Sequence, residues 1–134
     1  MKNMTSKKRI GVWAPLAAAG MLLGGCATIS ENTHAYLGTP RYPPTNPAQV
    51  QLLAAEPKQS TVRLGEVVLS TYGNPPDQKL EASMKAGAAK LGADGVYIVS
   101  DRTHIYPMLY WGCWGPAADE EWNRLIVGVA FKNK

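Results

Sequence analysis

Residues 80–100 read LEASMKAGAAKLGADGVYIVS, a helical pattern followed at once by a strand pattern. Apolar residues recur at spacings of four, four and three, which is typical of one face of a helix. Gly92 follows the last of them and is well placed to end that helix. From Gly95 to Ser100 the chain is apolar at both alternating positions, as in a strand that is covered on both faces. The apolar face of the predicted helix consists of Leu80, Met84, Ala88 and Leu91.

Two strands and a helix start are predicted before this unit. Residues 50–53 favour a short strand, and residues 61–72 are rich in β-branched side chains. The apolar positions of the second strand change parity at Gly65, where a bulge would restore the register. The segment Asn74-Pro75-Pro76-Asp77 combines a capping candidate with prolines, which is typical of a helix start.

The last strand is predicted from Arg124 to Phe131. One of its faces carries Ile126, Gly128 and Ala130, and these small residues suit close contact with the alanine-rich helix. The resulting order of elements is ββαββ. The sequence therefore predicts an α+β fold in which one mainly antiparallel sheet packs against a single helix.

The first 25 residues are basic and then apolar. They hold four basic residues and no acid, whereas residues 26–134 hold ten of each, so the net charge of +4 belongs to the N-terminus. This distribution gives no support to nucleic-acid binding. The apolar run from Ile10 to Leu23 is shorter than the roughly 20 residues that span a bilayer. We therefore predict a signal peptide over residues 1–25.

The end of this segment, Leu23-Gly24-Gly25-Cys26, resembles the lipobox of bacterial lipoproteins. The resemblance implies that Cys26 carries acyl chains such as palmitate and becomes the mature N-terminus. Three acyl chains would hold the protein firmly in the membrane, whereas a single acyl chain anchors a protein only marginally. Many such proteins carry an aspartate at the position of Ala27, and this aspartate retains them in the inner membrane. We therefore expect this protein to be anchored at the periplasmic face of the outer membrane. The alternative is an ordinary secreted protein with a chance cysteine at the cleavage site.

The mature chain is predicted to have two parts. Residues 26–47 are the lipidated N-terminus and a flexible tether, because four prolines between Pro40 and Pro47 favour extended chain at about 3.1 Å per residue. Residues 48–134 are the α+β periplasmic domain.

A helix end, a glycine and a strand start lie between Ala86 and Val96, after a strand that contains Leu64-Gly65-Glu66-Val67. This combination resembles a group of small bacterial envelope domains that includes the Rcs stress-sensor lipoprotein and the YbjQ-type domains, sometimes labelled heavy-metal-binding. The resemblance covers about residues 48–102 and brings no catalytic residue. The sensor lipoprotein has several core cysteines in disulfides, whereas here only Cys113 follows Cys26, so that redox framework does not carry over.

Residues suited to metal binding or catalysis are few. The histidines His34 and His104 lack the tight ligand spacing of metal sites. His104 and Cys113 would need an acid from residues 119–121 to complete a site. A cysteine nucleophile would need a base and an orienting group, and no such constellation stands out. We expect no enzymatic activity, no cofactor and no metal.

Cys113 is an unpaired thiol in a chain predicted to reach an oxidising compartment. Such a thiol is either buried and inert or available for intermolecular pairing. Burial is the favoured alternative.

Residues 103–122 are predicted to be a long connection, and they contain five of the ten aromatic residues that follow Cys26. These rings either cover an open sheet face as core or form an exposed contact patch. Because Gly112 and Gly115 permit a tight turn, we expect at least one of Trp111 and Trp114 to be exposed. The candidate interaction surface is Tyr106, Tyr110, Trp111 and Trp114.

The sequence thus favours a non-enzymatic outer-membrane lipoprotein that faces the periplasm and binds another envelope component. Its expected partners are the membrane, through the N-terminal lipid, and an envelope protein. The alternative function is an envelope lipoprotein that senses stress or metal.

Overall fold

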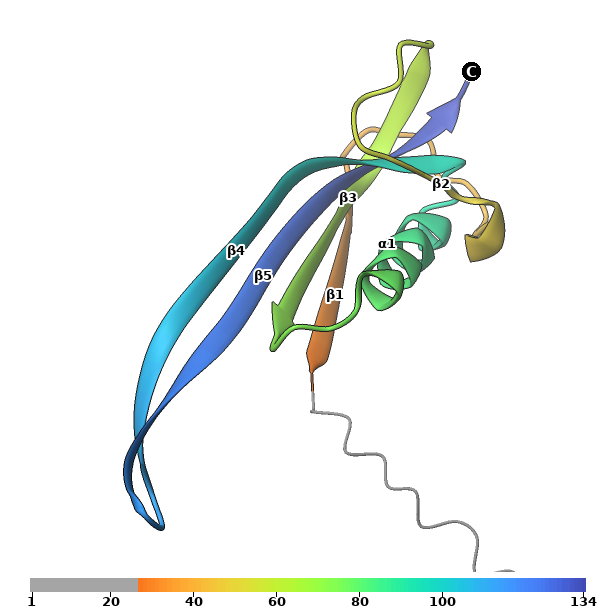
Figure 1. The fold of residues 1–134 in the computed structure, drawn as a ribbon. Coiled ribbons are helices and arrows are strands. Elements are labelled where there is room, and N and C mark those ends of the chain that lie inside the picture. Colours follow the sequence, from red (N-terminus) through yellow and green to blue (C-terminus); the bar gives the residue numbers. More distant parts are fainter. Residues whose placement is uncertain (1–26) are drawn as a thin grey trace, which may run out of the picture.

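The computed structural model describes residues 27–134, so the predicted signal peptide and Cys26 lie outside the described residues. The described chain forms one five-stranded mixed sheet and one α-helix, an α+β fold (Figure 1). The sheet order is β1-β3-β5-β4-β2, in which β2 pairs parallel with β4 and the other pairs are antiparallel. The elements are β1 (Thr28–Ala35), a 3-10 turn η1 (Pro47–Gln49), β2 (Gln51–Leu53), β3 (Thr61–Tyr72), α1 (Asp77–Lys90), β4 (Gly95–Gly112) and β5 (Gly115–Asn133).

The centre of the fold matches the local sequence patterns. Strand β3 has the predicted bounds, and its register with β5 shifts between Arg63 and Gly65, where the parity change predicts a bulge. Helix α1 is preceded by Pro76 rather than by the capping candidate Asn74, and no side chain of the described residues caps it. Gly92 follows the helix with a φ of 74°, a backbone conformation that favours glycine.

The predicted helix face packs on the predicted sheet face. Leu80, Met84 and Ala88 are buried, and Leu91 is half-buried against the same core. A Cβ atom at Gly128 would lie 2.8 Å from the sulfur of Met84, so the absent side chain lets α1 approach β5 closely. On the other face of the sheet, a second small core consists of Tyr97, Val129 and Phe131 with Tyr36 and Leu53.

The prediction of a flexible tether up to residue 47 is wrong. Residues 28–35 form β1, an edge strand paired antiparallel with β3 along its whole length. Alternate residues of β1 are half-buried on the helix side, and Glu31 there accepts a hydrogen bond of 2.7 Å from Lys90 of α1. The order along the described chain therefore begins with a strand that the predicted ββαββ order lacks.

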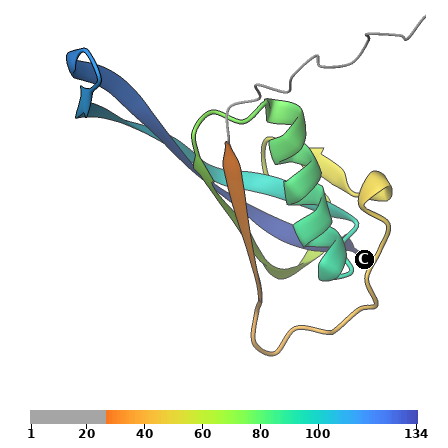
Figure 2. The same ribbon diagram turned by 90° about the horizontal axis from the view of Figure 1, so that it is seen from below.

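The proline-containing segment after β1 is also bound to the domain. The backbone N–H of Thr45 donates to the carbonyl of Ala89 at 2.9 Å, and its hydroxyl donates to the carbonyl of Ala93 at 2.9 Å. Tyr42 packs against the main core. These prolines favour an extended path, and that path wraps the C-terminal end of α1, as Figure 2 shows.

The prediction that residues 103–122 are a long connection between two strands is wrong as well. These residues continue β4 and β5 as a hairpin whose turn is Cys113-Trp114. Strands of 18 and 19 residues far exceed the usual length of about 3–10 residues, so nothing in ordinary strand statistics anticipates them.

Candidate interaction surface

The β4–β5 hairpin extends beyond the rest of the sheet. Strand β3 ends at Tyr72, opposite Asn123, so within residues 27–134 the hairpin from residue 105 to residue 122 has no third strand beside it. We call residues 105–122 the ribbon. It leaves the domain as a curved two-stranded arm (Figure 1). Gly112 lies eight residues beyond His104, which corresponds to a reach of about 27 Å.

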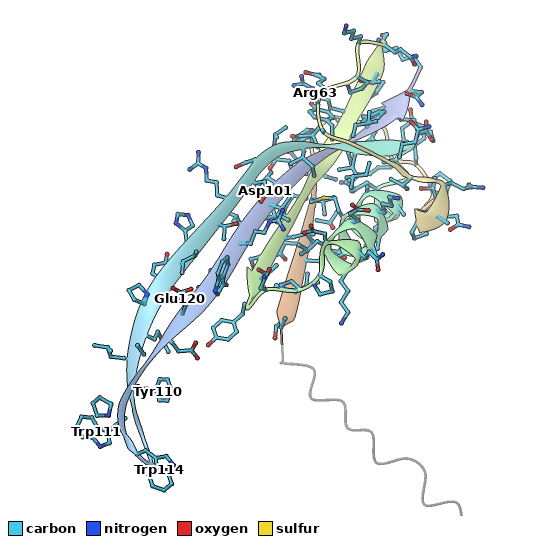
Figure 3. All side chains as sticks on the ribbon, in the orientation of Figure 1. Arg63, Asp101, Tyr110, Trp111, Trp114 and Glu120 are labelled. Atoms are coloured by element: carbon cyan, nitrogen blue, oxygen red, sulfur yellow. The ribbon has the colours of Figure 1, made fainter. Side chains whose placement is uncertain are left out.

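The ribbon closes in a two-residue turn. Gly112 pairs with Gly115, and Cys113 and Trp114 stand between them. Gly115 has a φ of 113°, which a residue with a side chain rarely adopts. The predicted tight turn is therefore present and depends on Gly115, and it carries Trp114 to the far end of the molecule (Figure 3).

The ribbon exposes large apolar side chains. Trp111 is 83% exposed, Leu109 is 84% exposed and Trp114 is fully exposed. The expectation that at least one tryptophan is exposed is confirmed. The favoured burial of Cys113 is wrong, because the turn presents its thiol to solvent. Ile105, Tyr106, Met108 and Tyr110 are also exposed, to about half of their surface.

Strand register divides the ribbon into two unlike faces. Residues directly opposite each other in an antiparallel pair share a face, and neighbours along a strand alternate. One face, called the apolar face, has Glu120 as its single charged residue and otherwise consists of Ile105, Pro107, Leu109, Trp111, Pro116, Ala118 and Trp122. The opposite face, called the polar face, consists of Tyr106, Met108, Tyr110, Ala117, Asp119 and Glu121.

The four predicted surface residues are therefore distributed over the ribbon. Trp111 lies on the apolar face, Tyr106 and Tyr110 lie on the polar face, and Trp114 is in the turn. The sequence prediction misses Leu109, which joins Trp111 on the apolar face. Residues 105, 107, 109 and 111 would share one face of a strand, so Leu109 would have been identified had this segment been assigned to a strand.

Two prolines interrupt the outer edges of the ribbon. The pair that flanks a two-residue turn is hydrogen-bonded, and such pairs alternate with pairs whose N–H groups point outward. By this count Pro107 and Pro116 occupy positions whose backbone nitrogen points away from the partner strand. Each proline therefore removes an N–H donor from an outer edge without removing a hydrogen bond of the hairpin. In the described residues β2 pairs with β4 only as far as Tyr97, so the β4 edge of the ribbon has no neighbour there.

Backbone and ionic contacts fix the base of the ribbon to the domain. The N–H of Gly73 donates to the carbonyl of Trp122 at 2.8 Å, just beyond the end of β3. The Arg124 guanidinium donates to both carboxylate oxygens of Asp101, at 2.8 Å and 2.6 Å, and to Asp77 at the start of α1, at 2.9 Å. Arg124 thus ties β4, β5 and α1 together where the ribbon begins.

The hydrogen bonds from Arg124 hold the pKa of Asp101 below its usual range, although partial burial opposes this. A carboxylate with a lowered folded-state pKa stabilises the fold above its unfolded-state pKa, and this stability is lost as the pH falls through the folded-state pKa. Replacing Asp101 with Asn is therefore expected to cost about 0.5–1 kcal/mol at neutral pH, as for a partly exposed bidentate pair. The difference from wild type should shrink below about pH 4. Urea titrations at several pH values test this, and a pH-independent difference would contradict it.

The sequence candidates for metal binding do not come together. Residues 27–134 contain no group of three or more His, Cys, Asp and Glu side chains placed to hold a metal ion. His104 is exposed near the base of the ribbon and stacks on Tyr106, with ring centroids 6.2 Å apart. Cys113 is in the turn, and His34 is exposed on β1.

An open cavity of about 420 Å³ extends from the start of β1 across β3 and β5 to the base of the ribbon. Thr28 and Ser30 of β1 line it together with His104 and Tyr106 of β4. Strand β1 therefore begins at the same end of the sheet as the base of the ribbon. The other lining residues are Ser70, Thr71, Tyr72, Asn123, Arg124 and Leu125.

No known protein family, curated protein or solved structure matches this chain. The resemblance to the sensor-lipoprotein and YbjQ-type group, which rests on residues 64–67 and 86–96, therefore stays a prediction. Among residues 27–134, the single α-helix, α1, is too short and too polar to cross a membrane.

Proposed function

We propose that this protein is a non-enzymatic lipoprotein of the outer membrane, anchored through Cys26 on the periplasmic face. In this proposal it binds another envelope component through the ribbon. The observation that carries the proposal is the exposure of Leu109, Trp111 and Trp114 at the end of the projecting ribbon.

The exposed side chains of the ribbon have no role in the core. An isolated two-stranded hairpin is at best marginally stable in water, and this one adds exposed apolar surface instead of covering it. Contiguous exposed apolar surface marks a site of interaction, and tryptophan and tyrosine are enriched in such sites. A contact role accounts for side chains that folding alone does not require.

The anchor is proposed from the sequence of residues 1–26. Mass spectrometry of the mature N-terminal peptide should show acyl groups on Cys26. Cys26→Ala should leave an unlipidated chain that is lost from the washed membrane fraction. An unmodified mature N-terminus in the wild-type protein would refute the anchor.

The contact role is tested by crosslinking in intact envelopes. A photoreactive side chain at Leu109, on the apolar face, should crosslink to an envelope component, and combining it with Trp111→Ala and Trp114→Ala should reduce the yield severalfold. Both substitutions should leave the free energy of unfolding within about 0.5 kcal/mol of wild type, because the indoles are exposed. A photoreactive side chain at the exposed Lys79 of α1 is the matched control. Equal yields from the two positions would contradict the contact role.

The alternative function, sensing of stress or metal, stays a prediction. No observation on residues 27–134 favours it over the contact role.

A further inference from the structure

We propose that the tip of the ribbon, residues 109–116, binds the lipid–water interface of the same membrane that holds the acylated Cys26. The inference rests on the proposed anchor and names the envelope component that the ribbon contacts. It follows from where the described chain begins, from the two faces of the ribbon and from its charge.

The described chain begins at the end of the sheet from which the ribbon extends. Thr28 pairs with Tyr72, and Tyr72 pairs with Asn123 at the base of the ribbon. Figures 1 and 2 both show β1 starting on that side of the domain. Cys26 is two residues from Thr28, and two residues span about 7 Å at most. Because residues 28–35 belong to the sheet, they add no tether, and an anchored Cys26 would hold the membrane close to the base of the ribbon.

The reach of the ribbon then constrains its orientation. Along the membrane normal, its tip would extend about 27 Å past the base, into a hydrocarbon layer about 30 Å thick. The unpaired backbone edges and the carboxylates of residues 119–121 would be desolvated there, at a large cost. A tilted ribbon avoids this cost, since its tip meets the interface while its edges and acids remain in water.

The chemistry of the tip suits an interface. Tryptophan and tyrosine concentrate at the boundary between headgroups and hydrocarbon. Leu109, Trp111, Pro116 and Ala118 make the distal part of the apolar face free of charge, and the three acids begin at Asp119, nearer the base. Figure 3 shows Trp111 and Trp114 at the end of the ribbon, with Glu120 set back from them. Because these acids lie nearer the base, only the tip of the ribbon can insert into the membrane.

One feature works against strand pairing with a protein, and a second determines which lipids the tip should bind. Pro107 interrupts the row of edge donors on β4, and Pro116 does so on β5, which works against addition of a partner strand. Residues 103–123 contain no Lys or Arg and carry three acids. Attraction to anionic headgroups therefore contributes nothing, and the tip should bind neutral lipid regardless of salt.

The test uses the lipidated mature chain in phosphatidylcholine vesicles, with tryptophan emission as the readout. In Trp122→Phe the emission comes from Trp111 and Trp114, whereas Trp111→Phe with Trp114→Phe leaves Trp122 as the reporter at the base. We expect the tip emission to be blue-shifted, strongly quenched by lipids brominated near the headgroups, and insensitive to added salt. Quenching of Trp122 should be severalfold weaker.

A pair of neighbouring substitutions tests which face meets the lipid. In the Trp122→Phe background, Leu109→Asp puts a charge on the apolar face and should abolish most of the quenching. Met108→Asp puts the same charge on the polar face and should leave the quenching unchanged. Both side chains are exposed, so neither substitution threatens the fold.

The outcomes separate this inference from the proposed function. Water-like, unquenched tip emission in a chain whose mass shows acylated Cys26 would overturn the inference and leave the anchor intact. Tip emission that shifts only when envelope proteins are added would also overturn it, and would assign the ribbon to a protein partner. A chain without acyl groups would refute both.

Discussion

Replacing Met84 with alanine is expected to lower the free energy of unfolding by about 2–5 kcal/mol, the range for truncation of a buried methionine. Met84 is 1% exposed and is the central residue of the α1 face that packs on the sheet. Its sulfur occupies the space left by the absent side chain of Gly128. Removal of three heavy atoms there opens a cavity between α1 and β5 that neither element can close without shifting the whole helix. Urea unfolding followed by circular dichroism measures the loss.

Met108→Ala is the matched control for this substitution. It removes the same atoms from a methionine that is 44% exposed on the ribbon, and should change stability by no more than about 0.5 kcal/mol. Similar losses at Met84 and Met108 would mean that the face of α1 defined by Leu80, Met84 and Ala88 is not the core of the domain.

The core could be predicted from the sequence because its signals are local. The spacing of Leu80, Met84 and Ala88, the helix-ending Gly92 and the β-branched residues of β3 each act within one element. Each also agrees with the tertiary structure, so propensity and packing favour the same conformation. This agreement extends to the parity change at Gly65, which identifies the bulge in β3 from the sequence alone.

Strand β1 could not be predicted in the same way. Ile29 is its only large aliphatic residue, and five of its eight positions are Thr, Ser, Glu or Asn. An edge strand that buries only one side needs few apolar residues, because its hydrogen bonds with β3 and the contact of Glu31 with Lys90 supply the pairing. These contacts are with residues thirty or more positions away, so no short window of the sequence contains them.

The first strand of the ribbon could not be predicted because it carries too many apolar residues rather than too few. Residues 105–111 are apolar on both faces of the strand, so the alternation that identifies a strand is absent. Their partners, residues 116–121, combine proline, alanine and acids, a composition typical of a loop. The candidate surface could still be identified, because a cluster of aromatic residues and a Gly-Cys-Trp-Gly turn are visible in the sequence. What the sequence does not reveal is the register that separates an apolar face from a polar one.

Replacing Gly65 with alanine is the second substitution for which we expect a large effect, and it tests the strand that the sequence does not predict. Gly65 pairs with Ala35 at the end of β1. A Cβ atom at Gly65 would clash with the carbonyl oxygen of His34 and lie 2.9 Å from the Cα atom of Ala35. Backbone atoms cannot move aside as a flexible side chain can, so β1 must separate from β3 there. We expect the free energy of unfolding, measured by urea titration, to fall by about 1–3 kcal/mol. The amide hydrogen of Tyr36, the residue after β1, should also exchange faster.

The matched control is Gly112→Ala, in which the added methyl group meets no atom of the described residues closer than 3.4 Å. Gly112→Ala should change the free energy of unfolding by no more than about 1 kcal/mol. The new methyl group fits into the folded protein, and it also restricts the backbone of the unfolded chain. If residues 26–47 were a free tether, no backbone would face Gly65, and the two alanine substitutions would behave alike. A loss confined to Gly65→Ala therefore requires β1 to be part of the sheet. That pairing, in turn, places Thr28 beside the base of the ribbon, so the same measurement tests the geometric premise on which membrane contact by the tip depends.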